Sequence, residues 1–154
     1  MSFDERISVG RESEVRFRRY AESMGFSVIE TSQHRDNPKN DNTRHFPDFF
    51  VLELSAFVQV KNGKNSAEYK NVIIEKVSYD AALYLSRWAR VVLMWEFPNG
   101  DWMGATIHRI NPCGEISDDA RKNGSGTPAI KVDKSILVKF DRNSVRHGFF
   151  PSSL

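Results

Sequence analysis

The sequence has a single cysteine, Cys113, among 154 residues. One cysteine cannot form a disulfide within the chain, and it cannot supply a metal site built from several cysteines. No apolar run approaches the roughly 20 residues that a membrane-spanning helix requires. The start MSFDERISVG carries two acidic residues in place of the apolar block of a signal peptide. We therefore expect a cytoplasmic, intracellular protein with no membrane partner, whose small size would suit a virus or a mobile element.

Several site classes are also missing. No phosphate-binding loop of the GxxxxGK[ST] type occurs, which disfavours ATP hydrolysis and a nucleotide cofactor. His34 and His45 stand eleven residues apart, and a zinc site would need more ligands at tighter spacing. Cys113 has no neighbouring histidine and acid that would make it a nucleophile, so we expect it to be passive.

The composition fits one folded domain, residues 1–154. Hydrophobic residues make up 40% of the chain, with eleven phenylalanines and three tryptophans, which is enough for one core. The net charge of +2 is only mildly basic, but the cations are clustered. The two clusters consist of Arg11, Arg16, Arg18 and Arg19, and of His34, Arg35, Lys39, Arg44 and His45. Such clusters fit a polyanion, and they fit a solvated surface equally well.

The first third of the chain predicts a helix, a strand and a long loop. Apolar residues follow helical spacing from Gly10 to Met24, and Gly25 is typical of a helix C-cap. A strand is expected over 26–31. Residues 32–46 are polar and rich in asparagine, which indicates a loop of functional length.

The middle of the chain predicts an antiparallel hairpin and then a second helix. The β-rich runs 48–54 and 57–62 are separated by a turn near Ser55. After a mixed connection at 63–76, a helix over 80–88 is expected, with Ser78 as its cap and with Ala81, Tyr84, Leu85 and Trp88 on one face.

The remaining elements are strands. Residues 91–97 and 102–110 flank a Pro-Asn-Gly turn and predict a hairpin, with Trp95 and Trp102 as a cross-strand pair. A loose stretch at 111–128 precedes one or two strands within 129–140. This order favours an α/β fold in which a central mixed sheet of five or more strands is flanked by helices. The second helix should form a crossover between parallel strands.

Polar residues interrupt the hairpin PDFFVLELSAFVQVK. Asp48 begins one strand, and Gln59 and Lys61 stand two apart on the next, so these two share a face. Carboxylate and amide oxygens suit Mg²⁺. Together with a lysine, such a site fits phosphodiester hydrolysis, because the metal activates water and offsets charge on the phosphate.

The first helix adds another acid. Glu14 lies three residues before Phe17 and seven before Ala21, so it shares their buried face, whereas Glu12 should face water. An acid on a buried helix face is unusual unless it has a partner such as a metal ion or its water.

The pattern Glu14, Pro47-Asp48 and Gln59-Val60-Lys61 resembles the PD-(D/E)XK nuclease superfamily. The run GRESEVRFRRYAESMGFSVIETS, the loop, PDFF and QVKNGK are similar in order to the archaeal-type Holliday junction resolvases. The likeness covers roughly residues 10–110 and leaves 111–154 as a C-terminal strand extension. In one departure, Gln59 stands where most members have a glutamate or an aspartate.

The resemblance implies a restriction-endonuclease-like core and a magnesium-dependent endonuclease. Glu14, Asp48 and Gln59, with the carbonyl of Val60, would hold Mg²⁺, for which Mn²⁺ should substitute, and Lys61 would assist catalysis. It also implies a homodimer that binds branched DNA such as a four-way junction. The residues expected to contact DNA are Arg11, Arg18, Ser32, His34, Arg35 and Lys64.

Three hypotheses remain open at this point. The first is a junction-resolving nuclease, with a restriction or repair nuclease acting on duplex DNA as its nearest competitor. The second is a DNA-binding module on the same fold that has lost catalysis, because Gln59 removes one negative charge from the site. The third is a protein-interaction domain whose charged face is merely solvated.

Overall fold

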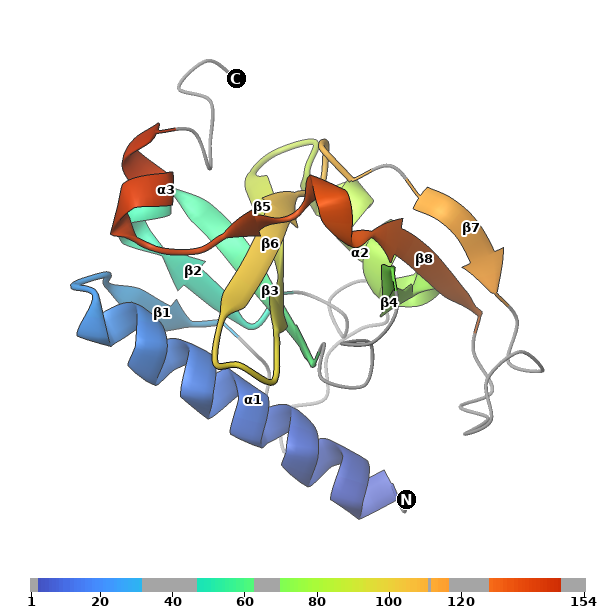
Figure 1. Ribbon diagram of the computed structural model, residues 1–154, viewed down its shortest axis with the longest axis horizontal. Coiled ribbons are helices and arrows are strands. Elements are labelled where there is room, and N and C mark those ends of the chain that lie inside the picture. Colours follow the sequence, from blue (N-terminus) through green and yellow to red (C-terminus); the bar gives the residue numbers. More distant parts are fainter. Residues whose placement is uncertain (1–2, 32–46, 63–69, 111, 117–127, 148–154) are drawn as a thin grey trace.

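The computed structural model describes residues 3–31, 47–62, 70–110, 112–116 and 128–147, which form two sheets and three helices (Figure 1). The helices are α1 (Phe3–Ser23), α2 (Lys76–Leu85) and α3 (Arg142–His147). The larger sheet consists, in spatial order, of β1 (Val28–Glu30), β2 (Phe49–Val51), β3 (Ala56–Asn62), β5 (Arg90–Glu96), β6 (Trp102–Thr106) and β9 (Val138–Lys139). The smaller sheet consists of β4 (Asn71–Glu75), β8 (Ala129–Asp133) and β7 (Pro112–Ile116).

Helix α1 starts earlier than the sequence predicts and ends where expected. Gly25 has a φ of +88°, the left-handed conformation that glycine adopts without strain. Its N–H donates to the carbonyl of Glu22 at 2.9 Å, and the N–H of Phe26 donates to the carbonyl of Ala21 at 3.1 Å. This pair of bonds is a Schellman motif, which closes the helix and turns the chain into β1.

Across the described part of the chain, no helix combines the length and apolar character needed to cross a bilayer.

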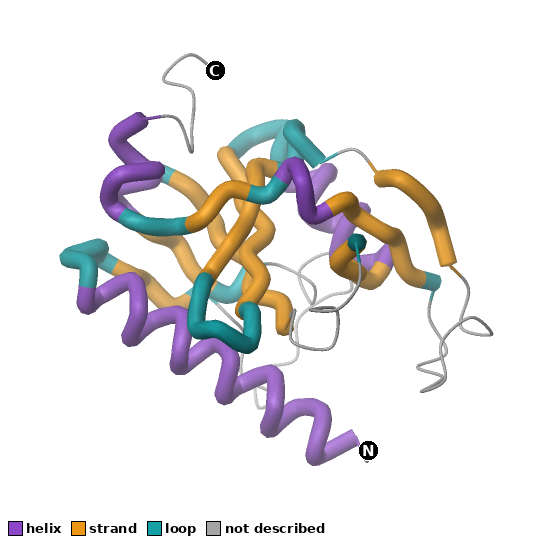
Figure 2. Tube along the Cα trace, viewed as in Figure 1, coloured by secondary structure: helices purple, strands orange, loops and turns teal. Residues whose placement is uncertain are grey.

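The larger sheet confirms the predicted mixed α/β topology. Strands β2 and β3 form an antiparallel hairpin, joined by the short 3-10 helix Leu52–Leu54 and by Ser55. Strand β5 pairs with β3 in parallel, so the segment that contains β4 and α2 is the expected crossover connection. A tight turn with Gly100 at a φ of +84° then joins β5 to the antiparallel β6 (Figure 2).

The larger sheet separates two hydrophobic cores. One face packs on α1, where Phe17 contacts Phe49 and Trp102 with ring centroids 5.6 and 5.3 Å apart. The other face packs on α2 and the smaller sheet, and its buried residues include Trp95. The predicted Trp95–Trp102 pair is therefore wrong. In the register of β5 and β6, Trp95 lies opposite Met103, so the two indoles belong to different cores.

The smaller sheet is not predicted from the sequence. Strand β4 lies in what reads as a mixed connection, and β7 lies in the loose stretch that begins at residue 111. Both strands pair with β8, which belongs to the segment where strands are expected. Every second residue of β4 is buried, Val72 and Ile74, which is the alternation of a half-buried strand.

Helix α2 differs from its prediction in start and in orientation. It begins at Lys76, so Ser78 lies inside the first turn and Glu75 takes the N-cap position. The side chains buried most deeply are Ser78 and Ala82, whereas Tyr84 is 50% and Trp88 68% exposed. The expected apolar face is therefore wrong at Tyr84 and Trp88, whereas Leu85 does pack against the core.

Candidate active site

Strands β2 and β3 separate at the position where the sequence places Asp48. The pairing of these strands ends at Phe49 and Val58, so Asp48 and Gln59 both lie directly beyond the last pair. The N–H of Asp48 still donates to the carbonyl of Val58 at 3.1 Å. Its carboxylate Oδ2 then accepts the N–H of Val60 at 2.8 Å, so a side chain replaces the backbone partner. Asp48 is thereby fixed at a fork in the sheet, with its carboxylate bound to the backbone of β3 at Val60.

The segment before β2 is tied to β1 on the other side of this fork. The N–H of Thr31 donates to the carbonyl of Asp48 at 2.9 Å. The Thr31 hydroxyl donates to the carbonyl of Pro47 at 2.7 Å. These bonds hold the backbone around Asp48 from both sides, which leaves its carboxylate little freedom to move.

Helix α1 brings Glu14 to the carboxylate of Asp48. Phe17 and Ala21 are fully buried on the same side of the helix, and Glu14 is half-buried beside them. Glu12 is exposed, as its helical position predicts. Burial, the negative charge of Asp48 and a hydrogen bond between the two carboxyl groups together raise the pKa of Glu14 to about 8, with burial as the largest cause.

The two carboxyl groups form a strained acidic pair. Burial also raises the pKa of Asp48, and this shift is opposed by the hydrogen bonds from Glu14 and from the N–H of Val60 and by the positive charge of Lys61. Two carboxylates this close cannot both ionise at low cost. At neutral pH the pair therefore retains a proton unless a cation takes its place.

Gln59 is the third oxygen donor at the fork. Its side chain is 7% exposed, and its Oε1 atom meets no hydrogen-bond donor among the described residues. Leaving a buried acceptor unsatisfied costs about 1–3 kcal/mol. The carbonyl of Val60 points to the same strand edge as its N–H, which faces Asp48.

These donors fit a hard divalent cation. Two carboxyl groups, an amide oxygen and a main-chain carbonyl are all oxygen ligands, the type that Mg²⁺ and Mn²⁺ prefer. No three His, Cys, Asp or Glu side chains gather within the described ranges, so the set depends on the amide of Gln59 for its third side chain. The like-charge pair and the unsatisfied Oε1 atom are both costs that a bound cation would remove.

Lys61 lies beside the acidic pair and is held from α2. Its Nζ donates to the hydroxyl of Ser78 at 3.1 Å. Burial lowers the pKa of Lys61, and the negative charges of Glu75, Asp48 and Glu14 oppose that shift. The sequence does not predict the hydrogen bond between Lys61 and Ser78, because a serine near a helix start is normally interpreted as an N-cap. The signal that could have revealed Ser78 is its position on the buried side of a short helix.

A second pair of charges fixes α1 to β5. The guanidinium of Arg16 donates from Nε to Oε2 of Glu96 at 2.5 Å and from a terminal nitrogen to Oε1 at 2.8 Å. Ser13 completes the cluster, accepting from Arg16 at 3.1 Å. Glu96 is 4% and Ser13 2% exposed. Sequence reasoning assigned Arg16 only to a basic cluster and missed Glu96, because the partners are 80 residues apart.

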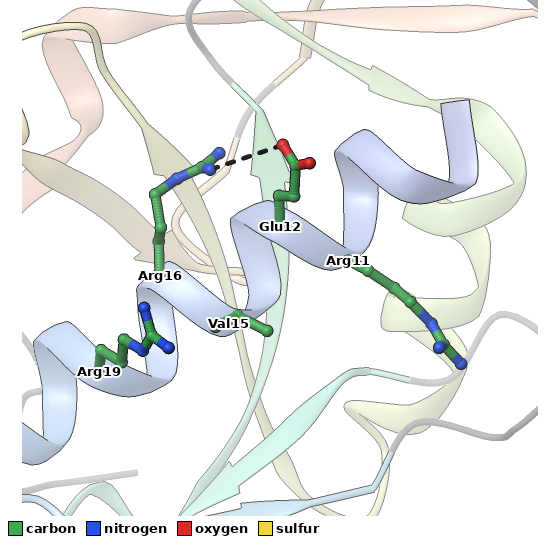
Figure 3. A pocket seen from close by; sticks show the side chains of 5 residues that line it. All are labelled: Arg11, Glu12, Val15, Arg16 and Arg19. Carbon is green, nitrogen blue, oxygen red and sulfur yellow. Dashed lines mark ion pairs between the residues drawn. The ribbon is translucent and has the colours of Figure 1, made fainter. Parts of the chain in front are cut away.

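The residues expected to contact DNA have different outcomes. Arg11 and Arg18 are both exposed on α1. The side chain of Arg11 is drawn in Figure 3, and its positive charge opposes the rise in the pKa of Glu14. Arg18 forms ion pairs with Glu22 at 2.7 Å and Glu30 at 3.9 Å, which the sequence does not predict. Three expected contacts, Ser32, His34 and Arg35, lie outside the described residues, and so does Lys64.

Comparison with known proteins supports the fold and leaves the activity open. No family model and no curated protein matches the sequence. The structure is similar to Hjc, a Holliday junction resolvase from the archaeal hyperthermophile Archaeoglobus fulgidus, solved at 1.6 Å resolution. The TM-score is 0.57, the similarity covers 92% of this chain and 98% of that chain, and the sequences are 13% identical. At this identity the likeness shows the resolvase fold alone, which confirms the predicted fold class.

Proposed function

We propose that this chain is a divalent-cation-dependent DNA endonuclease that acts on branched DNA in the manner of a Holliday junction resolvase. The observation that carries the proposal is the fork between β2 and β3, where Asp48, Glu14 and Lys61 interact electrostatically and the buried Gln59 follows the last paired residue of β3. These groups come from four separate stretches of the chain, counting the helix that holds Lys61 through Ser78. The resolvase fold supports the same function.

The roles of the residues follow from their positions. Glu14, Asp48, Gln59 and the carbonyl of Val60 would hold Mg²⁺ or Mn²⁺. The bound cation would supply Lewis-acid activation of water and offset charge on the scissile phosphate. Lys61, fixed by Ser78, would orient the attacking water and stabilise the negative charge that develops on the phosphate oxygens.

The proposed substrate is branched DNA, selected by shape and phosphate contacts more than by base edges. Resolution of a four-way junction requires two symmetric nicks, and one chain provides one fork. We therefore propose a homodimer as the active form. A single intracellular domain spanning residues 1–154 belongs to the same proposal, with residues 111–154 as an extension of the nuclease core.

Gln59 favours a second candidate function, a DNA-binding module without catalysis. A glutamine supplies an oxygen ligand but no charge, so it weakens the attraction for a divalent cation relative to a glutamate. Lys61 and the Glu14–Asp48 pair, which a binding module would not need, favour the nuclease.

The test is a cleavage panel with Mg²⁺ or Mn²⁺ on a four-way junction, a flap, plain duplex and single-stranded DNA. It compares the wild type with Lys61→Ala and with Lys139→Ala, an exposed lysine on β9 whose ion pair with Asp101 spans 3.5 Å. We expect the wild type and Lys139→Ala to cut the junction in preference to duplex, and Lys61→Ala to lose at least about 100-fold in rate.

The outcomes separate the candidates. Equal cleavage of plain duplex would contradict the junction preference and retain the nuclease. Binding of DNA by a folded wild type that cuts none of the four substrates would favour the binding module. Absence of both binding and cleavage would favour the protein-interaction domain.

A further inference from the structure

The outward face of α1 carries a row of side chains that the proposed catalytic site does not use. Arg11, Val15 and Arg19 follow one another at intervals of four residues, so they lie on one side of the helix. All three are exposed, and Val15 is 48% exposed. They line a shallow hollow of about 320 Å³ together with Glu12 and Arg16 (Figure 3).

The arginines of α1 differ in how far their charge is already neutralised. Arg16 is bound to the buried Glu96 and lies 3.9 Å from Glu12. Arg18 lies between Glu22 and Glu30. Arg11 and Arg19, by contrast, form no ion pair with any residue that the structure describes, and Arg11 lies three residues before Glu14 of the proposed cation site. Among the arginines of α1 whose side chains the structure describes, the available positive charge therefore belongs to Arg11 and Arg19.

The spacing of these two arginines suits a nucleic-acid backbone. Eight residues of α-helix separate their Cα atoms by about 12 Å. One strand of B-form DNA carries a phosphate about every 3.4 Å of helix axis, so the two guanidinium groups can reach different phosphates of one strand. Between them, Val15 offers an apolar surface of the kind that packs on a sugar.

We propose that Arg11, Val15 and Arg19 form the track along which the DNA backbone approaches the fork, and that Arg18 does not contact it. The track ends beside the catalytic pair, because Arg11 lies three residues before Glu14 on the same helix. The ion pairs of Arg18 offset its charge and hold its guanidinium to the protein. This assignment replaces the contact that the sequence predicts for Arg18. It rests on the proposed function for the identity of the partner.

The test measures how DNA affinity depends on salt. Fluorescence anisotropy with a labelled four-way junction, without divalent cation and between 50 and 200 mM salt, would compare the wild type with three single variants. The variants are Arg11→Gln, Arg19→Gln and, as the matched control on the same helix, Arg18→Gln. A double variant that combines Arg11→Gln with Arg19→Gln is measured as well. Circular dichroism would confirm that each retains its helix content.

Each phosphate contact contributes about 0.9 to the slope of log affinity against log salt for duplex DNA. We therefore expect Arg11→Gln and Arg19→Gln each to lower the slope by about 0.9, and the double variant by about 1.8. Arg18→Gln should leave the slope unchanged. At the lowest salt, Arg11→Gln and Arg19→Gln should weaken binding several-fold.

Two results would overturn the track. One is an unchanged slope in the double variant while the wild type binds the junction. The other is a loss in Arg18→Gln as large as that in Arg19→Gln. Neither result affects the nuclease proposal, which the cleavage panel decides separately. If the wild type cuts no DNA while the slopes change as expected, the track stands and the nuclease proposal fails.

Discussion

Glu14 and Arg16 stand two residues apart on α1, and the protein places them in opposite electrostatic situations. Glu14 faces Asp48, another carboxyl group, and burial and that neighbour raise its pKa to about 8. Arg16 faces Glu96, and the two form a bidentate pair that is closed by Ser13. One contact stores unfavourable energy at a fork in the sheet, whereas the other is a satisfied ion pair with one partner buried.

The difference indicates that neighbouring residues of α1 have different roles: Arg16 and Phe17 anchor the helix, whereas Glu14 contributes to the proposed cation site. A like-charge pair persists only if the surrounding structure holds its members together. Phe17 packs into the aromatic core, and Arg16 anchors the same turn to β5. These two contacts hold Glu14 against Asp48. The Arg16–Glu96 ion pair, which we call the stable pair, thus helps to position the Glu14–Asp48 pair, which we call the unstable pair. The unstable pair is where a cation would bind.

The largest effect should come from breaking the stable pair. Glu96→Ala leaves Arg16 and Ser13 without their buried acceptor, and removing one partner of a buried pair typically costs about 3–5 kcal/mol. Because Arg16 is partly exposed and can reach water, we expect the lower end of this range, about 3 kcal/mol. Chemical denaturation would measure the loss in the free energy of unfolding.

Glu22→Ala is the matched control, because it breaks the exposed ion pair with Arg18 on the same helix. Such an exposed pair contributes little to the free energy of unfolding, so Glu22→Ala should lose much less stability than Glu96→Ala. If both variants lose the same stability, the Arg16–Glu96 pair does not anchor α1.

At the Glu14–Asp48 pair we expect a smaller effect of opposite sign, because a substitution there should raise the free energy of unfolding. The pKa of Glu14 is 4.5 in an unfolded chain and about 8 in the folded protein. Between these values the unfolded state loses its proton first, so the free energy of unfolding of the cation-free protein should fall as pH rises from 4.5 to 8. Glu14→Gln removes this dependence and should stabilise the protein at pH 8 by about 1–2 kcal/mol, after allowance for the exposed part of the side chain.

Urea denaturation of both proteins at pH 4 and pH 8, in the presence of a chelator, would measure this effect. The variant should gain stability over the wild type only at the higher pH. An equal difference at both values would indicate a packing effect and would contradict the like-charge account.

The smallest effect should come from Ser78, which we regard as a positioning residue for Lys61. Ser78→Ala removes the acceptor of the Lys61 Nζ without touching the substrate, so kcat should fall about 3- to 10-fold with little change in KM. The loss of an acceptor that favours the charged amine should also lower the pKa of Lys61 further, and the pH profile of kcat should shift with it.

Ser78→Thr retains the hydroxyl and should recover most of the rate. A loss in Ser78→Thr equal to that in Ser78→Ala, with an unchanged pH profile, would reduce Ser78 to a packing residue of α2.

The sequence predicts the parts of this site that depend on local spacing. Helical periodicity places Glu14 beside Phe17 and Ala21, and strand alternation places Gln59 and Lys61 on one face. Local spacing does not predict contacts between segments that are far apart in the sequence. Glu96 reads as the polar end of a buried strand, and only the packing of α1 against β5 gives it Arg16 as a partner.

The same limit applies to the fold. The larger sheet follows from turn residues and β-rich runs, but β4 and β7 become strands because β8 pairs with both. Such tertiary pairing overrides weak local preference. The exposed Trp88 shows the converse, because an apolar residue at helical spacing need not face the core.

The central claim is that the fork holds a divalent cation between Glu14, Asp48 and Gln59. Isothermal titration of the wild type and of Asp48→Asn with Mg²⁺, at pH 7 in two buffers of different ionisation enthalpy, tests it directly. We predict one saturable site in the wild type and release of a large fraction of one proton, because Glu14 is mostly protonated below its pKa of about 8. Asp48→Asn should abolish both. Absence of saturable binding by the folded wild type, or equal binding by Asp48→Asn, would contradict the account.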